Sequence, residues 1–188
     1  MNAALWYTSR ATGLASLVML TGVLVLGALN SARFATRNWP RFTVADLHRN
    51  LSLITVAFLA VHIVTAILDP FAGIGWLSIL VPFISTYYPF WLGLGAVALD
   101  LLLALLVSSL LRPRIKPQVW RAIHWAAYAC WPIAVLHGWG IGGADSRQAW
   151  VLILTGVCVL AAALAVAWRA NVRHPDTEAR RRPWSGVR

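Results

Sequence analysis

Charged side chains are scarce in this sequence. Only 12% of its 188 residues are charged, whereas 60% are hydrophobic. A soluble domain is about one quarter charged, so this chain has too few polar residues to cover a water-facing surface. The net charge of +10 does not indicate nucleic-acid binding. The charges occur in short stretches between apolar segments, as membrane topology signals do.

Cysteine is also rare. Cys130 and Cys158 lie within apolar segments, where we expect them to be small buried hydrophobic residues. The sequence contains no CxxCH motif, which excludes a covalently attached c-type haem.

Long apolar segments make up most of the chain, and each is close to the roughly 20 residues that a spanning helix needs. The five expected spans are Ala11 to Leu29, about Val44 to Leu68, Phe90 to Leu111, about Gln118 to Gly138, and Ala149 to Trp168. The first is longer than the apolar core of a signal peptide, so we expect a permanent helix. The sequence therefore predicts an all-α integral membrane protein built as a five-helix bundle.

Basic residues are unequally distributed between the connections. Fourteen of the sixteen follow the first span, lie between the third and fourth, or belong to the Arg-rich tail of residues 169–188. Only Arg10 and Arg147 remain for the other side. The positive-inside tendency predicts an N-terminus outside and a cytoplasmic tail. The second and fourth spans then both run outward from the cytoplasm.

Four histidines lie in those two spans. His48 and His62 are fourteen residues apart, and His124 and His137 are thirteen apart. At about 1.5 Å per residue, each spacing covers roughly 20 Å of an apolar core about 30 Å thick, so each span carries one histidine per leaflet. The topology pairs His48 with His124 at the inner level and His62 with His137 at the outer. His174 lies in the polar tail, where we expect a solvated histidine.

Two facing imidazoles at each level favour bis-histidine haem. Neutral imidazole ligates iron, copper or zinc, but a structural zinc site takes four close ligands. Helix bundles commonly hold cofactors between facing helices. The alternative is a transporter whose histidines pass a metal ion or protons across the membrane.

The two spacings differ in their helical geometry. Fourteen residues return within about 40° of the starting face, whereas thirteen leave His137 about 140° from His124. We expect Pro132, which lies between the two histidines, to kink or locally unwind that helix.

These features resemble the ferric reductase-like transmembrane domain. That domain is shared by NADPH oxidases, metalloreductases and the haem-bearing membrane subunit of bacterial methionine sulfoxide reductase. The likeness covers about residues 5 to 168, and SRATGL (Ser9 to Leu14), WRAIHW (Trp120 to Trp125) and WPIAVLHGWG (Trp131 to Gly140) are similar to actinobacterial members. It implies a dihaem transmembrane domain over residues 1–168, with His48, His62, His124 and His137 as axial and metal ligands of two haem b groups.

The chain departs from that family in two respects. The family usually has six helices with ligands on the third and fifth, whereas here they fall on the second and fourth. The sequence after Trp168 has no GxGxxG motif, and a flavin is possible but not indicated. We therefore expect an oxidoreductase component of the bacterial cytoplasmic membrane that carries electrons from a separate flavin-type or quinol donor to a periplasmic or cell-surface acceptor.

Several other residues are secondary candidates. Arg49 and Arg121, beside the inner ligands, are expected either to pair with haem propionates or to act only as topology determinants. Arg10 is a candidate contact of an outer propionate, and Gly13 permits close approach of backbone and porphyrin. The connection Asp69 to Pro89 is expected to form an interfacial or re-entrant lid. Asp100 either makes a structural hydrogen bond or handles protons.

Overall fold

A computed structural model describes residues 3–32, 34, 36 and 39–171, with the backbone alone at Arg41. Over these residues the protein is helical and has no strands. The elements are α1 (Ala3–Ser31), α2 (Arg41–Leu68), α3 (Leu77–Leu80), α4 (Pro89–Leu110), η1 (Arg112–Arg114), α5 (Pro117–His124), α6 (Ala127–Ile141), η2 (Asp145–Arg147) and α7 (Ala149–Asn171).

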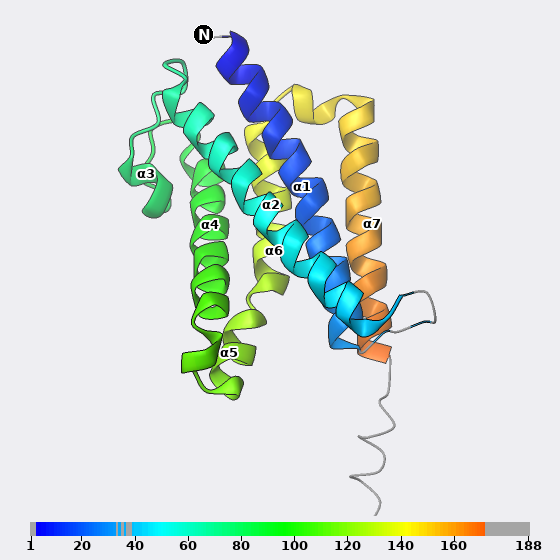
Figure 1. Cartoon of the computed structure of the whole chain (residues 1–188). Helices are drawn as coiled ribbons and strands as arrows, with labels where there is room; N and C mark the ends of the chain where they lie inside the picture. Colours follow the sequence, from blue (N-terminus) through cyan, green and yellow to red (C-terminus); the bar gives the residue numbers. More distant parts are fainter. Residues whose placement is uncertain (1–2, 33, 35, 37–38, 172–188) are drawn as a thin grey trace, which may run out of the picture.

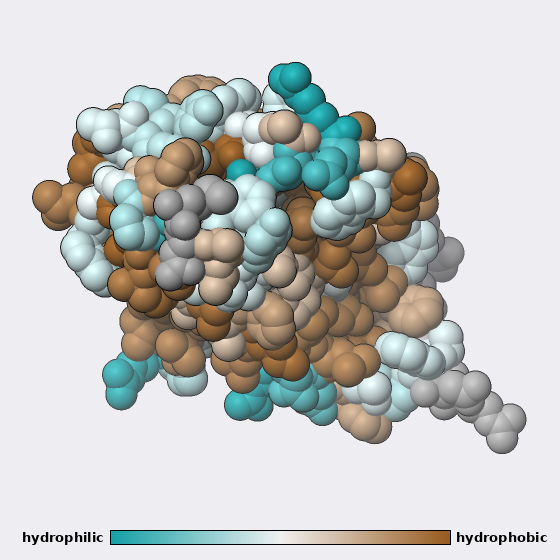
Figure 2. Space-filling model, turned by 90° about the horizontal axis from the view of Figure 1, so that it is seen from above, coloured by the Kyte–Doolittle hydropathy of each residue, from teal (hydrophilic) through white to brown (hydrophobic). Residues whose placement is uncertain are grey.

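Four of the described helices, α1, α2, α4 and α7, are long and apolar enough to cross a membrane. They contain the first, second, third and fifth predicted spans, apart from Leu111, which follows the end of α4. Many of their large apolar side chains face outward rather than into the protein, including Leu53, Ile153 and Leu164. Viewed from above, broad apolar areas alternate with patches of hydrophilic residues (Figure 2). The outward-facing apolar side chains of the long helices suit a hydrocarbon environment.

The helices form an antiparallel bundle (Figure 1). In that view α1, α4 and α7 begin at the upper end of the bundle and finish at its lower end, while α2 and α6 run upward. The helix α1 packs against α2, α6 and α7, and α4 packs against α6. Both cysteines are buried, as predicted, and the Cys130 thiol donates to the Ala98 carbonyl on α4.

The fourth predicted span is not one helix. It is divided into α5 and α6 at Trp125 and Ala126, and α7 is held beside the division by Arg169. The Arg169 guanidinium lies over the Trp125 ring, 4.5 Å from its centroid, and donates to the Tyr128 hydroxyl. The prediction of a single helix over 118–138 is therefore wrong.

The division lies about two turns before Pro132, where we expected the kink. Backbone bonds from Ala126 to the Ile123 carbonyl and from Tyr128 to the Trp125 carbonyl have the i→i+3 spacing of a 3₁₀ turn. Each residue of a 3₁₀ turn rotates the chain by about 120°, whereas each residue of an α-helix rotates it by about 100°. The extra rotation reduces the angular mismatch that the thirteen-residue spacing gives in a regular helix. Pro132 itself lies within α6.

The connection between α2 and α4 turns back beside α4 at the upper end, and α3 packs against α4 (Figure 1). Positive φ angles at Phe83 (68°) and Tyr88 (41°) reverse the chain. A Cβ atom at Gly93 of α4 would clash with the Phe83 ring, so this glycine permits the close packing. Other large apolar residues here are exposed, among them Trp76 at 68%.

Candidate functional site

The four predicted histidines come together in two pairs, in the combinations that the topology predicts. The ring centroids of His48 and His124 are 6.4 Å apart, with an angle of 68° between the planes. Those of His62 and His137 are 6.5 Å apart, at 79°. His48 lies near the start of α2 and His124 at the end of α5, so the first pair lies towards the lower end of the bundle. His62 and His137 lie near the upper ends of α2 and α6, so the second pair lies towards the upper end.

In the upper pair, both rings are oriented by backbone carbonyls of neighbouring helices. His62 Nδ1 lies 2.7 Å from the Ser9 carbonyl oxygen on α1, and His137 Nδ1 lies 2.8 Å from that of Trp91 on α4. A carbonyl only accepts hydrogen bonds, so each Nδ1 carries the proton and Nε2 keeps its lone pair. This is the arrangement found around metal-binding histidines.

The lower pair is oriented differently. His48 Nδ1 lies 3.0 Å from the Val23 carbonyl on α1. His124 Nδ1 is buried and has no hydrogen-bond partner among the described residues. Its ring instead stacks on Trp120, with centroids 4.6 Å apart and planes at 23°. The Arg112 guanidinium covers the same indole at 4.4 Å, so a cation–aromatic stack leads from the lower surface to His124.

A cavity of about 550 Å³ adjoins the upper pair. His62 and His137 form part of its wall, together with small and apolar residues of α1, α4 and α6. The connection before α4 contributes Ile74, Ser78 and Ile79. The expected lid segment is therefore part of the wall. Ser16, which is 1% exposed, also lines the cavity, and its hydroxyl has no hydrogen-bond partner among the described residues.

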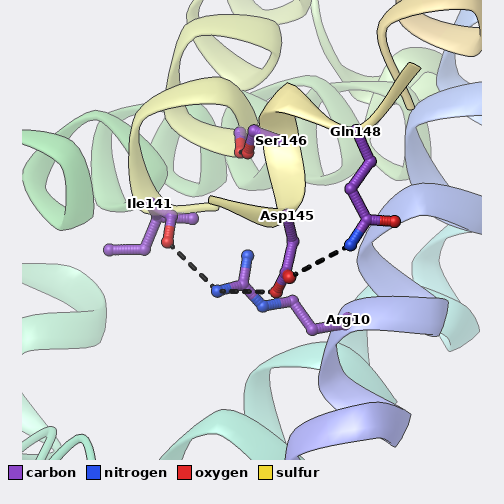
Figure 3. A network of polar contacts seen from close by, with 6 residues as sticks. Arg10, Ile141, Asp145, Ser146 and Gln148 are labelled. Carbon is purple, nitrogen blue, oxygen red and sulfur yellow. Dashed lines mark hydrogen bonds and ion pairs between the residues drawn. The ribbon is translucent and has the colours of Figure 1, made fainter. Parts of the chain in front are cut away.

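A polar network joins α1 to the turn between α6 and α7 beside this cavity (Figure 3). Arg10 donates to the Ile141 carbonyl at 3.3 Å and lies 4.0 Å from the Asp145 carboxylate. Gln148 donates to the same carboxylate at 3.4 Å. Arg10 therefore lines the cavity near both upper histidines, with its guanidinium already engaged by acceptors of the turn.

The lower end carries a smaller cavity of about 310 Å³, lined by Arg112, Pro117, Trp120 and Arg121. Arg121 thus lies beside the Trp120–His124 stack, at a site suited to an anionic group. Arg49 is exposed on α2, directly after His48. Asp100 lies partly buried within α4. His174 and the rest of the predicted tail beyond Asn171 lie outside the described residues.

Sequence reasoning missed the backbone partners of the histidines. It considered Gly13 only as a place for a porphyrin to approach, whereas Gly13 in fact packs against the His62 ring. Gly27 packs against His48 on the same pair of helices. The two glycines are fourteen residues apart, as are the two histidines. A matching spacing on two antiparallel segments was the signal that could have revealed this contact.

The sequence matches the model of a known protein family. The profile described as ferric reductase like transmembrane component matches residues 12–135, about two thirds of the chain. No curated protein and no solved structure matches the sequence. Among the described residues, no three or more His, Cys, Asp or Glu side chains are grouped as ligands for a metal ion. Each histidine level therefore offers two imidazoles.

Proposed function

Because the chain belongs to the ferric reductase-like transmembrane family, we propose that it carries electrons across a membrane through two bis-histidine b-type haems. His48 and His124 would hold one haem, and His62 and His137 the other. The chain is then the membrane subunit of a reductase system whose electron donor is a separate protein or quinol.

The distance between the paired rings carries this proposal. Two imidazoles bound through Nε2 to one metal at about 2.0–2.1 Å have ring centres about 6.3 Å apart. The observed separations are 6.4 and 6.5 Å. Six-coordinate iron takes two axial ligands and receives four nitrogens from the porphyrin, so two imidazoles per level are sufficient. The upper cavity of about 550 Å³ is of the size that cofactor sites have.

When bound, haem supplies the one-electron chemistry, and the protein supplies ligation and surroundings. The two imidazoles of a pair would both hold the haem iron, which would favour electron transfer over binding of oxygen. The carbonyls of Ser9, Val23 and Trp91 accept from the Nδ1–H groups of three histidines, which leaves their Nε2 lone pairs available to a metal. Apolar residues of α1, α2 and α4 line much of the cavity beside the upper pair and would give a bound haem surroundings of low polarity.

We also propose that the protein crosses the bacterial cytoplasmic membrane five times, with α5 and α6 together forming the fourth crossing. The lower end would face the cytoplasm, with the N-terminus outside and the tail of residues 169–188 inside. The exposed basic residues at the lower end support this orientation: Arg49, Arg112, Arg114, Lys116 and Arg121. Lipid would cover the exposed apolar faces of the long helices.

The donor would dock at the lower end. A cationic face attracts an acidic partner and steers its approach, which suits a flavin-type reductase. Arg121 and Arg112 line the lower cavity and would pair with propionates of the lower haem or with a carboxylate of the donor. Electrons would leave from the upper level, beneath the connection of residues 69–88, to a periplasmic or cell-surface acceptor.

A haem determination on the purified full-length protein tests this function. The pyridine-haemochrome assay is expected to give about two haems per chain, extractable into acid-acetone because no covalent anchor exists. Protein that contains no haem and binds zinc or copper tightly would reject the proposal and favour a histidine-lined transporter.

A further inference from the structure

Three of the four paired histidines meet the same backbone feature on a neighbouring helix. The ring lies against a glycine, and its Nδ1 bonds the carbonyl of the residue four positions earlier. We call this feature a carbonyl notch. The notches are Ser9–Gly13 for His62, Val23–Gly27 for His48, and Trp91–Gly95 for His137.

The four-residue spacing has a physical reason. In an α-helix the carbonyl of residue i accepts from the N–H of residue i+4, and the Cβ of residue i+4 lies beside that oxygen. A glycine at i+4 leaves the oxygen open to a second donor. The carbonyl then serves both the helix and the imidazole.

The glycines leave no room for a side chain. A Cβ atom at Gly95 would lie 2.6 Å from Nδ1 and Cε1 of His137. At Gly13 it would lie 3.0 Å from the same atoms of His62. At Gly27 it would lie 3.2 Å from Cε1 of His48. These contacts are closer than Cβ atoms normally make, so alanine would push each ring away from its carbonyl.

We propose that Gly13, Gly27 and Gly95 are positioning residues for the histidine ligands. Each glycine exposes one carbonyl, which holds the proton on Nδ1 and fixes the rotation of the ring about its Cα–Cβ and Cβ–Cγ bonds. The notch therefore determines the direction of Nε2 and the angle between the two ring planes of a pair. This inference rests on the proposed function, because the ligand role of the histidines does.

The fourth histidine supports the specificity of the feature. Among the described glycines, none has the His124 ring as the nearest neighbour of its Cβ position. His124 Nδ1 also has no acceptor among the described residues. The upper level has two notches and the lower level has one.

Substitutions at two further glycines provide controls that distinguish an effect on the position of a histidine ring from an effect on helix packing. A Cβ atom at Gly22 of α1 would lie 2.9 Å from the Leu51 Cδ2 atom, the end of a flexible side chain. At Gly156 of α7 it would meet no atom within 4 Å. Gly22→Ala is therefore a packing control on the same helix as two notches, and Gly156→Ala is an open-space control.

The test uses single variants of the full chain, purified in detergent and loaded with haem. Gly27→Ala is expected to weaken haem retention at the lower level about 10–100-fold, as loss of an outer-shell partner does. It should also change the lower low-spin EPR signal, which depends on the angle between the ring planes, and raise the midpoint potential of that haem. Gly13→Ala and Gly95→Ala should produce these changes at the upper level alone. Both controls should leave the two signals and potentials unchanged.

Two results would overturn the inference while leaving the proposed function intact. One is a Gly27→Ala protein with two haems and unaltered signals and potentials. The other is a Gly22→Ala protein with the same changes as Gly27→Ala, which would assign the effect to helix packing. A wild-type protein without haem would instead reject the function.

A measurement on the wild type keeps the inference testable if a variant fails to fold. In the reduced, diamagnetic protein labelled with ¹⁵N-histidine, three of the four Nδ1–H protons should have the downfield shift of a hydrogen bond. The fourth, from His124, should lack it. Four equivalent Nδ1–H protons would contradict the assignment.

Discussion

The upper and lower histidine pairs have nearly the same ring separation but are built in different ways. Both upper rings are held by backbone carbonyls of α1 and α4, beside a cavity that Arg10 and Asp145 help to line. In the lower pair only His48 has such a carbonyl, and His124 is supported by a Trp120–Arg112 stack at the surface. The upper site is therefore fixed by backbone and the lower site partly by side chains.

Nearly the same separation of two histidine rings is therefore reached with two different kinds of support. Backbone carbonyls of packed helices move little, because each also belongs to its helix. An aromatic and guanidinium stack at the surface is more easily displaced. We expect the lower site to be the more adaptable of the two, which suits the end where we propose that the electron donor docks.

Removal of a ligand should give the largest effect. His62→Ala and His137→Ala are each expected to abolish the upper haem and retain the lower, because one haem needs both imidazoles. His48→Ala and His124→Ala should do the reverse. Haem content and EPR of the four variants check this, with His174→Ala in the tail as a control that keeps both haems. The pairing is wrong if His48→Ala and His62→Ala remove the same haem.

Neutralising the lower basic cluster should give the next largest effect. Electrostatic steering raises association rates by about 10–10³-fold, so changing Arg112, Arg114 and Lys116 to Gln should slow donor-driven reduction by at least tenfold at low salt. The wild-type rate should itself fall as salt increases. Stopped-flow reduction in oriented vesicles measures both, with Arg147→Gln at the upper end as control. A donor that works only from the upper side would reverse the proposed direction.

Replacing Trp120 tests the side-chain support of His124 directly. An aromatic stack contributes about 0.5–1.5 kcal/mol, so Trp120→Leu should weaken haem retention at the lower level about 2–10-fold and leave the upper level unchanged. Transfer of haem to an external acceptor protein measures the two dissociation rates. Trp76→Leu, in the exposed connection, is the matched control. Equal loss from both levels would indicate a general destabilisation instead.

The smallest effects are expected at the upper network. Arg10 and Asp145 are 31% and 39% exposed, and an ion pair of this kind contributes at most about 1 kcal/mol. Asp145→Asn should therefore change thermal stability little. If Arg10 also contacts an upper propionate, Arg10→Gln should speed upper haem loss more than Asp145→Asn does. Identical dissociation rates for the two variants would limit Arg10 to joining α1 to the turn.

Much of the fold was predictable because apolar length is a local property. The long uncharged segments become α1, α2, α4 and α7. The fourth span was mispredicted because hydropathy does not detect a change from i→i+4 to i→i+3 bonds at Trp125 and Ala126. Pro132 was a reasonable signal of irregularity, but contacts of Arg169 with Trp125 and Tyr128 lie at the actual break.

The candidate site was likewise only partly predictable from the sequence. The positions of the four histidines and the antiparallel order of the helices follow from the sequence, and together they predict which histidines face each other. The sequence alone therefore determined the membrane class, the two levels and the pairing. Only the tertiary structure revealed which carbonyl meets each Nδ1, which glycine admits each ring, and why His124 differs. Those features depend on the rotation and register of packed helices to within an ångström, which residue spacing along one segment does not specify.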